Sequence, residues 1–374
     1  MSDPQPQSHP RPAARPRPLR HRVAFAGFAV LLTVPLVGAA QPAASAVKPT
    51  AIVSMGDSFI SGEAAGSYEP GTDQPGNFCH RSQVAEIHVA PIPADASINL
   101  ACSGATTDNV ALGGSPRNGE APQAERLRAV AAEYDVTLIV LSIGGNDVGF
   151  SDLVLDCIAA YFLIAPRCQD VWADRLPAAL EAAAPRIAQN IADIHTVMAE
   201  AGDTDYQLVL QSYSSPVTED NRYSLTKLLH GCPIRDDDAQ WAREVAIPLF
   251  TATLGEVAAR SGVRFLDMGP ALRGREVCAR GITHDQEWVT GINIDLAQLR
   301  NGLGSHLVRH SMHPNARGHA QFGLCLGEFY ASSDNAASCV RGADGNLHAT
   351  PLTALPTPST EVLPYIPEPV PTAA

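Results

Sequence analysis

Residues 51–58 read AIVSMGDS, an apolar run that ends in a glycine, an aspartate and a serine. The run predicts a buried β-strand, and the Gly-Asp pair predicts a turn at its end. Ligands of an open α/β sheet gather beyond the carboxyl ends of the strands, so the Ser58 hydroxyl lies where a nucleophile could act. Most serines after a strand only cap a helix, however. The G-x-S-x-G spacing of an α/β-hydrolase elbow is absent as well.

The rest of the chain repeats this alternation of strand and turn. Further runs rich in Val, Ile and Leu predict strands at 98–101, 137–143, 207–211 and 263–268. Stretches with helical spacing predict helices at 123–134, 187–200, 240–259 and 315–330. Strands that alternate with helices predict a doubly wound parallel sheet with helices on both faces.

The first 46 residues have the layout of a secretory signal peptide. An arginine-rich segment leads into residues 23–40, which carry no charge, and the small residues Ala44 and Ala46 frame a cleavage site. We therefore expect residues 1–46 to be removed and the protein to be secreted. The alternative is an uncleaved membrane anchor, because eighteen apolar residues approach the lower length limit of a spanning helix.

The chain is acidic, with a formal net charge of −13. Removing the signal takes away five arginines and one aspartate, which brings the charge to −17. Such a field repels nucleic acid and anionic membranes. We expect no nucleic-acid partner, no stable membrane insertion after signal removal, and a monomer. The predicted domain covers residues 47–345, and the Pro-rich residues 346–374 predict an extended tail.

All eight cysteines follow the signal, and an even number in an exported chain predicts disulfide bonds. We predict pairing in sequence order, because each bridge then closes a local loop and stabilises the fold by about 2–4 kcal/mol. The predicted pairs are Cys79–Cys102, Cys157–Cys168, Cys232–Cys278 and Cys325–Cys339. No spacing matches a zinc site, so metal binding is the weaker alternative.

Three more segments fall at the predicted edge of the sheet where Ser58 lies. Gly104 follows the second strand, Asn146 follows the third in a G-G-N-D stretch, and His313 stands before a proline ahead of the last helix. A glycine lets its N–H group approach a ligand closely, and the Asn146 amide is a neutral donor. Together with the Ser58 N–H group they could form an oxyanion hole with three donors.

These four blocks, in this order and spacing, resemble the SGNH/GDSL hydrolases, and specifically their secreted bacterial lipase and esterase branch. The resemblance covers roughly residues 48–330. It implies a three-layer α/β/α sandwich with a five-stranded parallel sheet, flavodoxin-like in arrangement, and hydrolysis without a metal or organic cofactor. Ser58 would be the nucleophile, His313 the general base, and Ser58, Gly104 and Asn146 the oxyanion hole of an acyl-enzyme mechanism.

One position departs from the family pattern, which places an aspartate three residues before the catalytic histidine. That position is His310, whose side chain cannot supply a carboxylate. We therefore expect the backbone carbonyl of His310 to orient His313, which makes the site a dyad. The alternative is an aspartate that reaches in from another loop.

The first functional hypothesis is an extracellular hydrolase of acyl glycerides or similar lipid esters. A phospholipase and a carbohydrate O-deacetylase stay open, because the shape of the groove rather than the motifs sets acyl preference. A non-catalytic binding module is the hypothesis from another class. The only feature that favours this hypothesis is His310 at the position where the family has an aspartate.

Overall fold

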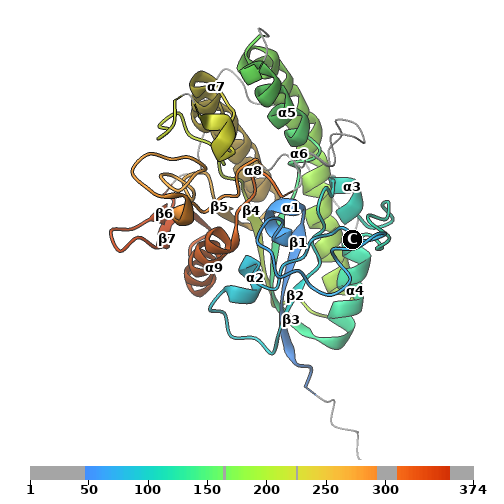
Figure 1. Ribbon diagram of the computed structural model, residues 1–374. Helices are drawn as coiled ribbons and strands as arrows, with labels where there is room; N and C mark the ends of the chain where they lie inside the picture. Colours follow the sequence, from blue (N-terminus) through green and yellow to red (C-terminus); the bar gives the residue numbers. More distant parts are fainter. Residues whose placement is uncertain (1–46, 163–165, 225, 293–309, 354–374) are drawn as a thin grey trace, which may run out of the picture. The chain divides into compact units, whose positions relative to one another are not determined.

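Seven strands form one sheet in the computed structural model, which describes residues 47–162, 166–224, 226–292 and 310–353 (Figure 1). The predicted signal, residues 1–46, lies outside the described residues. Across the sheet the strands follow the order β2-β1-β3-β4-β5-β6-β7. Their bounds are Thr50–Gly56 (β1), Ala96–Asn99 (β2), Asp135–Ser142 (β3), Gln207–Gln211 (β4), Arg264–Asp267 (β5), Ala336–Arg341 (β6) and Leu347–Pro351 (β7).

The expected parallel sheet is confirmed, but its strand number of five is wrong. Strands β1 to β6 all pair in parallel, and β7 pairs with β6 in the antiparallel direction. The five predicted strands are β1 to β5. The two added strands have half-exposed ends and lack a continuous run of large aliphatic residues, which is why hydrophobicity alone does not reveal them.

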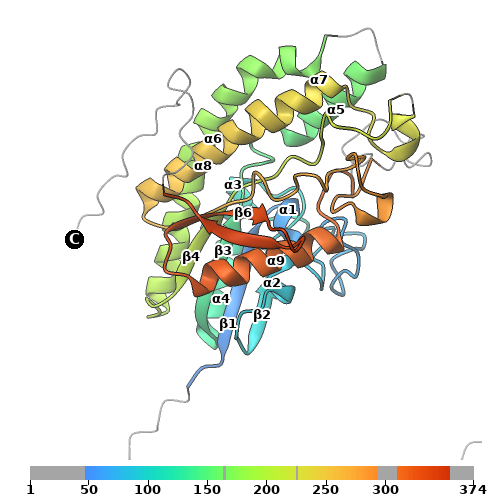
Figure 2. The ribbon, with the colours of Figure 1, turned by 90° about the vertical axis from the view of Figure 1, so that its left-hand side faces the viewer.

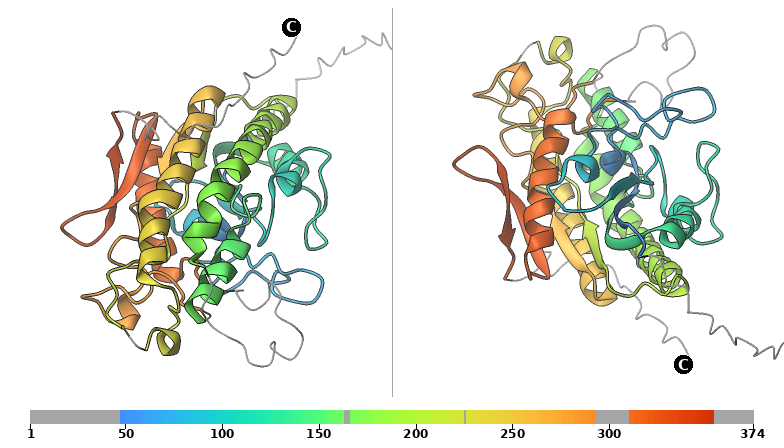
Figure 3. Two further views of the ribbon diagram at one scale, coloured as in Figure 1. Left: turned by 90° about the horizontal axis from the view of Figure 1, so that it is seen from above. Right: turned by 90° about the horizontal axis from the view of Figure 1, so that it is seen from below.

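Two layers of helices enclose the sheet (Figures 2 and 3). Helices α4, α6 and α8 pack on one face, while α2 and α9 pack together on the other. The helices are α1 Ser58–Ser61, α2 Glu86–Val89, α3 Thr107–Val110, α4 Gln123–Glu133, α5 Phe150–Phe162, α6 Cys168–Glu200, α7 Asp236–Trp241, α8 Ile247–Ser261 and α9 Ala316–Ala331. Shorter helical turns are η1 Lys227–His230, the π-helical η2 Ala242–Ala246 and η3 His284–Gln286.

The C-terminal boundary of the domain differs from the prediction. Strand β7 begins at Leu347, inside the segment 346–374 that the sequence assigned to the tail. The sheet therefore continues to Pro351. A proline is tolerated there because β7 is an edge strand, and one side of an edge strand needs no N–H donor. The proline-rich residues 354–374 lie outside the described part of the chain.

The predicted disulfide pairing is confirmed. All four bridges join consecutive cysteines: Cys79–Cys102, Cys157–Cys168, Cys232–Cys278 and Cys325–Cys339. Two of them brace elements that matter below, since the first fixes the loop after β2 and the second links α5 to α6. Among the described helices, none is both long and apolar enough to cross a bilayer.

The strand order reverses at β1, and this reversal positions the site. The chain leaves β1 to form β2 on one side and then crosses to form β3 on the other. Loops after β1, β2 and β3 therefore meet above the same end of the sheet, the position where open α/β sheets bind ligands. The strand itself is fully buried from Ala51 to Val53 and at Met55.

Candidate active site

The turn after β1 is fixed by close backbone contacts. Gly56 has a φ of 137°, and a Cβ atom there would lie 1.9 Å from the carbonyl oxygen of Ser142 at the end of β3. Only glycine fits this conformation and this approach. The Gln123 side chain binds both the N–H and the carbonyl of Gly56, at 2.7 and 2.8 Å. Ser58 is thereby held at the start of the short helix α1.

Asp57 supports the turn rather than the chemistry. Its Oδ1 accepts the Phe59 N–H at 3.0 Å, and its Oδ2 accepts the Tyr213 hydroxyl at 2.6 Å. The same hydroxyl accepts the N–H of Gly145 at 3.2 Å. Burial raises the pKa of Asp57 to about 7 against the opposing hydrogen bonds. Tyr213 therefore ties the Ser58 turn to the loop that carries Asn146.

His313 faces Ser58 across the site, with 2.7 Å between its Nε2 and the serine Oγ. The chain around His313 is held by a second segment. Thr290 donates its N–H to the His313 carbonyl at 3.0 Å and accepts the Met312 N–H at 2.8 Å. Asn315 caps α9 with its side-chain oxygen and anchors its Nδ2 on the Glu287 carbonyl at 2.9 Å. The imidazole thus precedes a capped helix and is not left on a free loop.

The expected orienting group of His313 was wrong by one residue. Its Nδ1 lies 2.6 Å from the carbonyl oxygen of Ser311, and not at the carbonyl of His310. His310 and Met312 both have left-handed φ values, 62° and 57°, so the chain turns sharply on either side of Ser311. This turn places the carbonyl of Ser311, two residues before His313, next to the imidazole ring. The result is a local hydrogen bond from a side chain to the backbone. Nδ1 then carries the proton and Nε2 is free to accept one from Ser58.

The groups expected to bind an oxyanion lie around Ser58. Asn146 and Gly104 line one pocket with Ser58 and His313. Asn146 donates one amide hydrogen to the Ala105 carbonyl at 2.8 Å, which orients the amide. Within the described part of the chain, no acceptor is recorded for the N–H groups of Ser58 and Gly104. Two backbone donors and one side-chain donor therefore remain available for a negative oxygen.

The electrostatics around His313 favour a neutral imidazole. Burial lowers the pKa of His313 below the ordinary histidine value, and the charge of Glu63 opposes this shift. A neutral ring can accept the serine proton, as a general base must.

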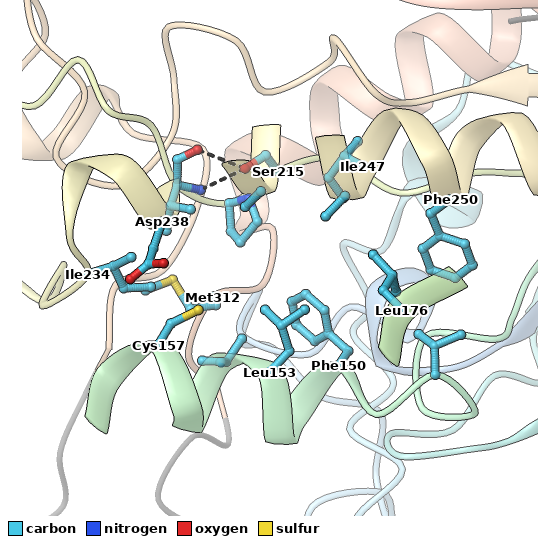
Figure 4. A pocket seen from close by; sticks show the side chains of 16 residues that line it. Phe150, Leu153, Cys157, Leu176, Ser215, Ile234, Asp238, Ile247, Phe250 and Met312 are labelled. Carbon is cyan, nitrogen blue, oxygen red and sulfur yellow. Dashed lines mark hydrogen bonds between the residues drawn. The ribbon is translucent and has the colours of Figure 1, made fainter. Parts of the chain in front are cut away.

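Two pockets of different character open from Ser58 and His313. The first is lined mostly by residues with polar side chains, among them Glu63 and Arg117. The second contains Phe59, Phe150, Phe250 and Met312, and continues into an adjoining apolar pocket. Figure 4 shows that adjoining pocket, with Phe150, Leu153 and Cys157 of α5 facing Ile234, Asp238 and Met312. Met312 contributes to both apolar pockets, so the turn that orients His313 also forms part of the pocket wall.

One group of side chains in the described residues has potential metal ligands close together. Oxygen and nitrogen atoms of Glu63, His80 and His310 all lie within 4.8 Å of one another. They already bind one another and their neighbours. Glu63 Oε2 contacts His80 Nδ1 at 2.7 Å and accepts the Ser103 hydroxyl, and its Oε1 accepts the His310 N–H at 2.9 Å. The group is a satisfied hydrogen-bond network as it stands.

Sequence reasoning overlooked three contributors to this site. Neither Glu63 nor His80 is among the site residues predicted from the sequence. Tyr213 lies in the loop after β4, where no motif marks it. Helix α5 was not predicted either, although its apolar spacing from Phe150 to Phe162 is a usable signal.

Known proteins resemble this chain as follows. The model of the GDSL-like lipase/acylhydrolase family matches residues 54–321. A lipase from Streptomyces rimosus is 35% identical over 144 residues, which cover 37% of this chain and 47% of that protein. Lipase 1 from Streptomyces coelicolor is 34% identical over 122 residues, 32% of this chain and 37% of that one. The matched regions thus span less than half of these curated relatives.

Solved structures are similar at lower identity. Phospholipase A1 from Streptomyces albidoflavus NA297 aligns with a TM-score of 0.49 at 22% identity, over 73% of this chain and 95% of that chain. The extracellular lipase from Streptomyces rimosus aligns with a TM-score of 0.46 at 23% identity, over 72% and 94%.

Proposed function

The chain belongs to the GDSL-like lipase/acylhydrolase family, and on that premise we propose that it is a serine carboxylic-ester hydrolase with an apolar acyl specificity. One observation carries the proposal: His313 Nε2 lies 2.7 Å from Ser58 Oγ, in a pocket that Gly104 and Asn146 also line. Each group alone has a structural explanation. That residues from four separate segments line one pocket favours a catalytic role for the group.

The proposed reaction has two acyl-transfer steps. Ser58 Oγ attacks the ester carbonyl carbon while His313 Nε2 takes its proton, and the carbonyl oxygen becomes negative. The N–H groups of Ser58 and Gly104 and the Asn146 amide would bind that oxygen. The imidazolium then gives its proton to the departing alcohol, which leaves an acyl group on Ser58. Water repeats the sequence and releases the acid.

The apolar pockets supply the acyl specificity. The pocket that starts at Ser58 shares Phe150, Ile247, Phe250 and Met312 with the deeper one. An acyl chain attached to Ser58 could therefore pass Asp57 at the start of the pocket and extend between α5 and α8 as far as Asp238 (Figure 4). Burial of each methylene there would contribute about 0.8 kcal/mol. Esters with medium or long acyl chains fit this lining best.

The departing alcohol would lie on the polar side. Ser103, Asn118 and Ser151 line that pocket with Arg117, whose Nε donates to the Ser103 carbonyl at 3.3 Å. A hydroxylated or charged alcohol is suited to such a wall. Both a glyceride and a phospholipid satisfy this division between an apolar acyl group and a polar head.

The test is a substrate panel on the chain from Val47 onward. Acetyl, octanoyl and palmitoyl p-nitrophenyl esters are compared with a phospholipid and an acetylated sugar. We expect octanoyl and palmitoyl esters to be hydrolysed faster than the acetyl ester. Activity confined to acetyl groups would overturn the acyl assignment and favour an O-deacetylase. No hydrolysis of any ester would favour the non-catalytic binding module.

The acyl pocket itself predicts the effect of Leu153→Trp. Leu153 projects from α5 into the apolar pocket, so an indole there would occupy the space of the distal methylenes (Figure 4). We expect kcat/KM on the palmitoyl ester to fall about tenfold or more, while the acetyl ester is hydrolysed at the wild-type rate.

Ala159→Trp is the matched control for this change. It places the same side chain on the same helix, at an exposed position outside the pocket lining. An equal loss on the palmitoyl ester in both variants would show that α5 tolerates no indole. In that case the Leu153→Trp result would not support the assignment of this pocket to the acyl chain.

We further propose an extracellular monomer whose partner is its ester substrate. Four disulfide bonds in the described chain support an oxidising compartment. The net charge of −13 argues against nucleic acid. N-terminal sequencing of the exported protein should begin near Val47, and its elution on size exclusion should match one chain.

A further inference from the structure

We propose that Glu63 is the positioning residue of His313: its carboxylate holds the turn that carries the imidazole and supplies the negative charge that faces it. The role of His313 as general base comes from the proposed function, and the inference rests on it. Glu63 lies only five residues after Ser58. The nucleophile and the carboxylate that supports its base would thus share one loop.

The first support is the hold of Glu63 on the turn. Its Oε1 accepts the backbone N–H of His310 at 2.9 Å and lies 3.3 Å from the Nδ1 of the same residue. His310 has a left-handed φ, a conformation that costs a non-glycine residue free energy and persists only where the surroundings fix it. Fixing His310 also fixes the next residue, Ser311, whose carbonyl receives Nδ1 of His313. Glu63 therefore acts on the imidazole through two residues of backbone.

The second support is the charge. The Ser311 carbonyl can fix the tautomer of His313, but it is a dipole and lacks the full charge of a triad carboxylate. Glu63 lines the same pocket as Ser58 and His313, and its side chain is only 3% exposed. Burial raises the pKa of Glu63, but the hydrogen bonds from His80 and Ser103 and the charge of His313 lower it to about 2. The carboxylate is therefore ionised wherever the imidazole titrates.

The other titratable groups around His313 do not replace this charge. His310 and His80 lower the pKa of His313, and burial holds His319 of α9 neutral, with a pKa of about 3. Asp57, on the Ser58 turn, has its pKa raised to about 7 by burial and is engaged by Tyr213. Arg117, which lines the same pocket, is a cation. Among these described groups, Glu63 is the carboxylate whose charge raises the pKa of His313.

The test uses Glu63→Gln, which keeps an oxygen for the His310 N–H but removes the charge. Without the charge, the imidazolium loses stabilisation, so the pKa of His313 should fall. We expect the acid limb of the pH profile of kcat/KM to move to lower pH. The plateau rate should also drop about tenfold or more, which is part of the rate acceleration that a general base contributes. A variant that only damaged the structure would lower the rate without moving the limb.

A readout independent of turnover keeps the two proposals apart. The pKa of His313 is measured directly by NMR titration of the ring, in the wild type and in Glu63→Gln. If the wild type hydrolyses no ester, the proposed function fails, yet the titration still tests Glu63. An unchanged pKa of His313 in a folded Glu63→Gln protein overturns the inference, whatever happens to the rate.

Two further variants complete the design. Glu287→Gln is the matched control, because Glu287 is also a buried carboxylate with an ion pair, here to Arg222, its side chain does not line the pocket, and the substitution keeps the backbone carbonyl that accepts Asn315. It should lower the melting temperature without moving the pKa of His313. If Glu63→Gln does not fold, Glu63→Asp replaces it. That variant keeps the charge but draws the carboxylate back by one methylene from the His310 N–H, so the pKa of His313 should fall by less and the rate should also fall. A wild-type pKa together with a wild-type rate overturns the inference.

Discussion

Replacing Ser58 by alanine is expected to lower ester hydrolysis by about 10⁴- to 10⁶-fold, the scale seen when a serine hydrolase loses its nucleophile. The turn is held by contacts of Gly56, Asp57 and Gln123, and the Ser58 hydroxyl is not one of them. The melting temperature should therefore stay close to that of the wild type. Rates are measured on the best ester of the panel, under single-turnover conditions.

Ser151→Ala is the matched control for Ser58→Ala. It removes another hydroxyl from the same polar pocket, but not one in contact with His313. We expect its rate to stay within about tenfold of the wild type. An organophosphate should label the wild type at Ser58 and leave Ser58→Ala unlabelled. A labelled serine elsewhere would identify a different nucleophile, and a Ser58→Ala protein with near-normal turnover would end the proposed mechanism.

The second large effect is expected for His313→Ala, which should cost nearly as much as Ser58→Ala. The substitution removes the imidazole that contacts the Ser58 hydroxyl, and in the proposed mechanism the two residues act as one unit. Turnover should fall by about 10⁴-fold or more, and labelling by an organophosphate should slow in parallel. Both are measured at a pH where the wild-type rate is on its plateau.

His310→Ala provides the contrast, at a position three residues away. The orienting acceptor is the Ser311 carbonyl, and the His310 backbone N–H still reaches Glu63 when the ring is absent. We therefore expect a loss of no more than about tenfold, or about 1.4 kcal/mol in the barrier. A loss of several orders of magnitude in a folded His310→Ala protein would make the ring itself essential and would contradict the dyad.

From the sequence it could be predicted that Ser58, Gly104, Asn146 and His313 lie close together, although their catalytic roles stay a proposal. Each predicted block follows a strand or precedes a helix, so the parallel order of β1, β2 and β3 was enough to bring Ser58, Gly104 and Asn146 to one edge. The disulfide pairing followed from short loop closure, since no bridge spans more than 46 residues. These features depend on order along the chain and need no side-chain detail.

What the sequence could not predict depends on backbone torsion and on long-range packing. The choice between the carbonyls of His310 and Ser311 is decided by two left-handed residues, neither of which is glycine. Glu63 meets His310 across 247 positions of sequence, a contact that no local pattern encodes. Strand β7 is stabilised by pairing with β6, and its composition alone resembles a coil.

That last strand has a practical consequence for anyone who expresses the protein. Strand β7 covers β6 over five residue pairs, from Ala337 with Pro351 to Arg341 with Leu347. A chain cut at residue 345, the predicted end of the domain, would leave the N–H and carbonyl groups of β6 bare on the side that β7 covers. Such an edge can pair with the same edge of another copy, which is a common route to aggregation. Truncated versions meant for crystallisation should therefore end beyond Pro351.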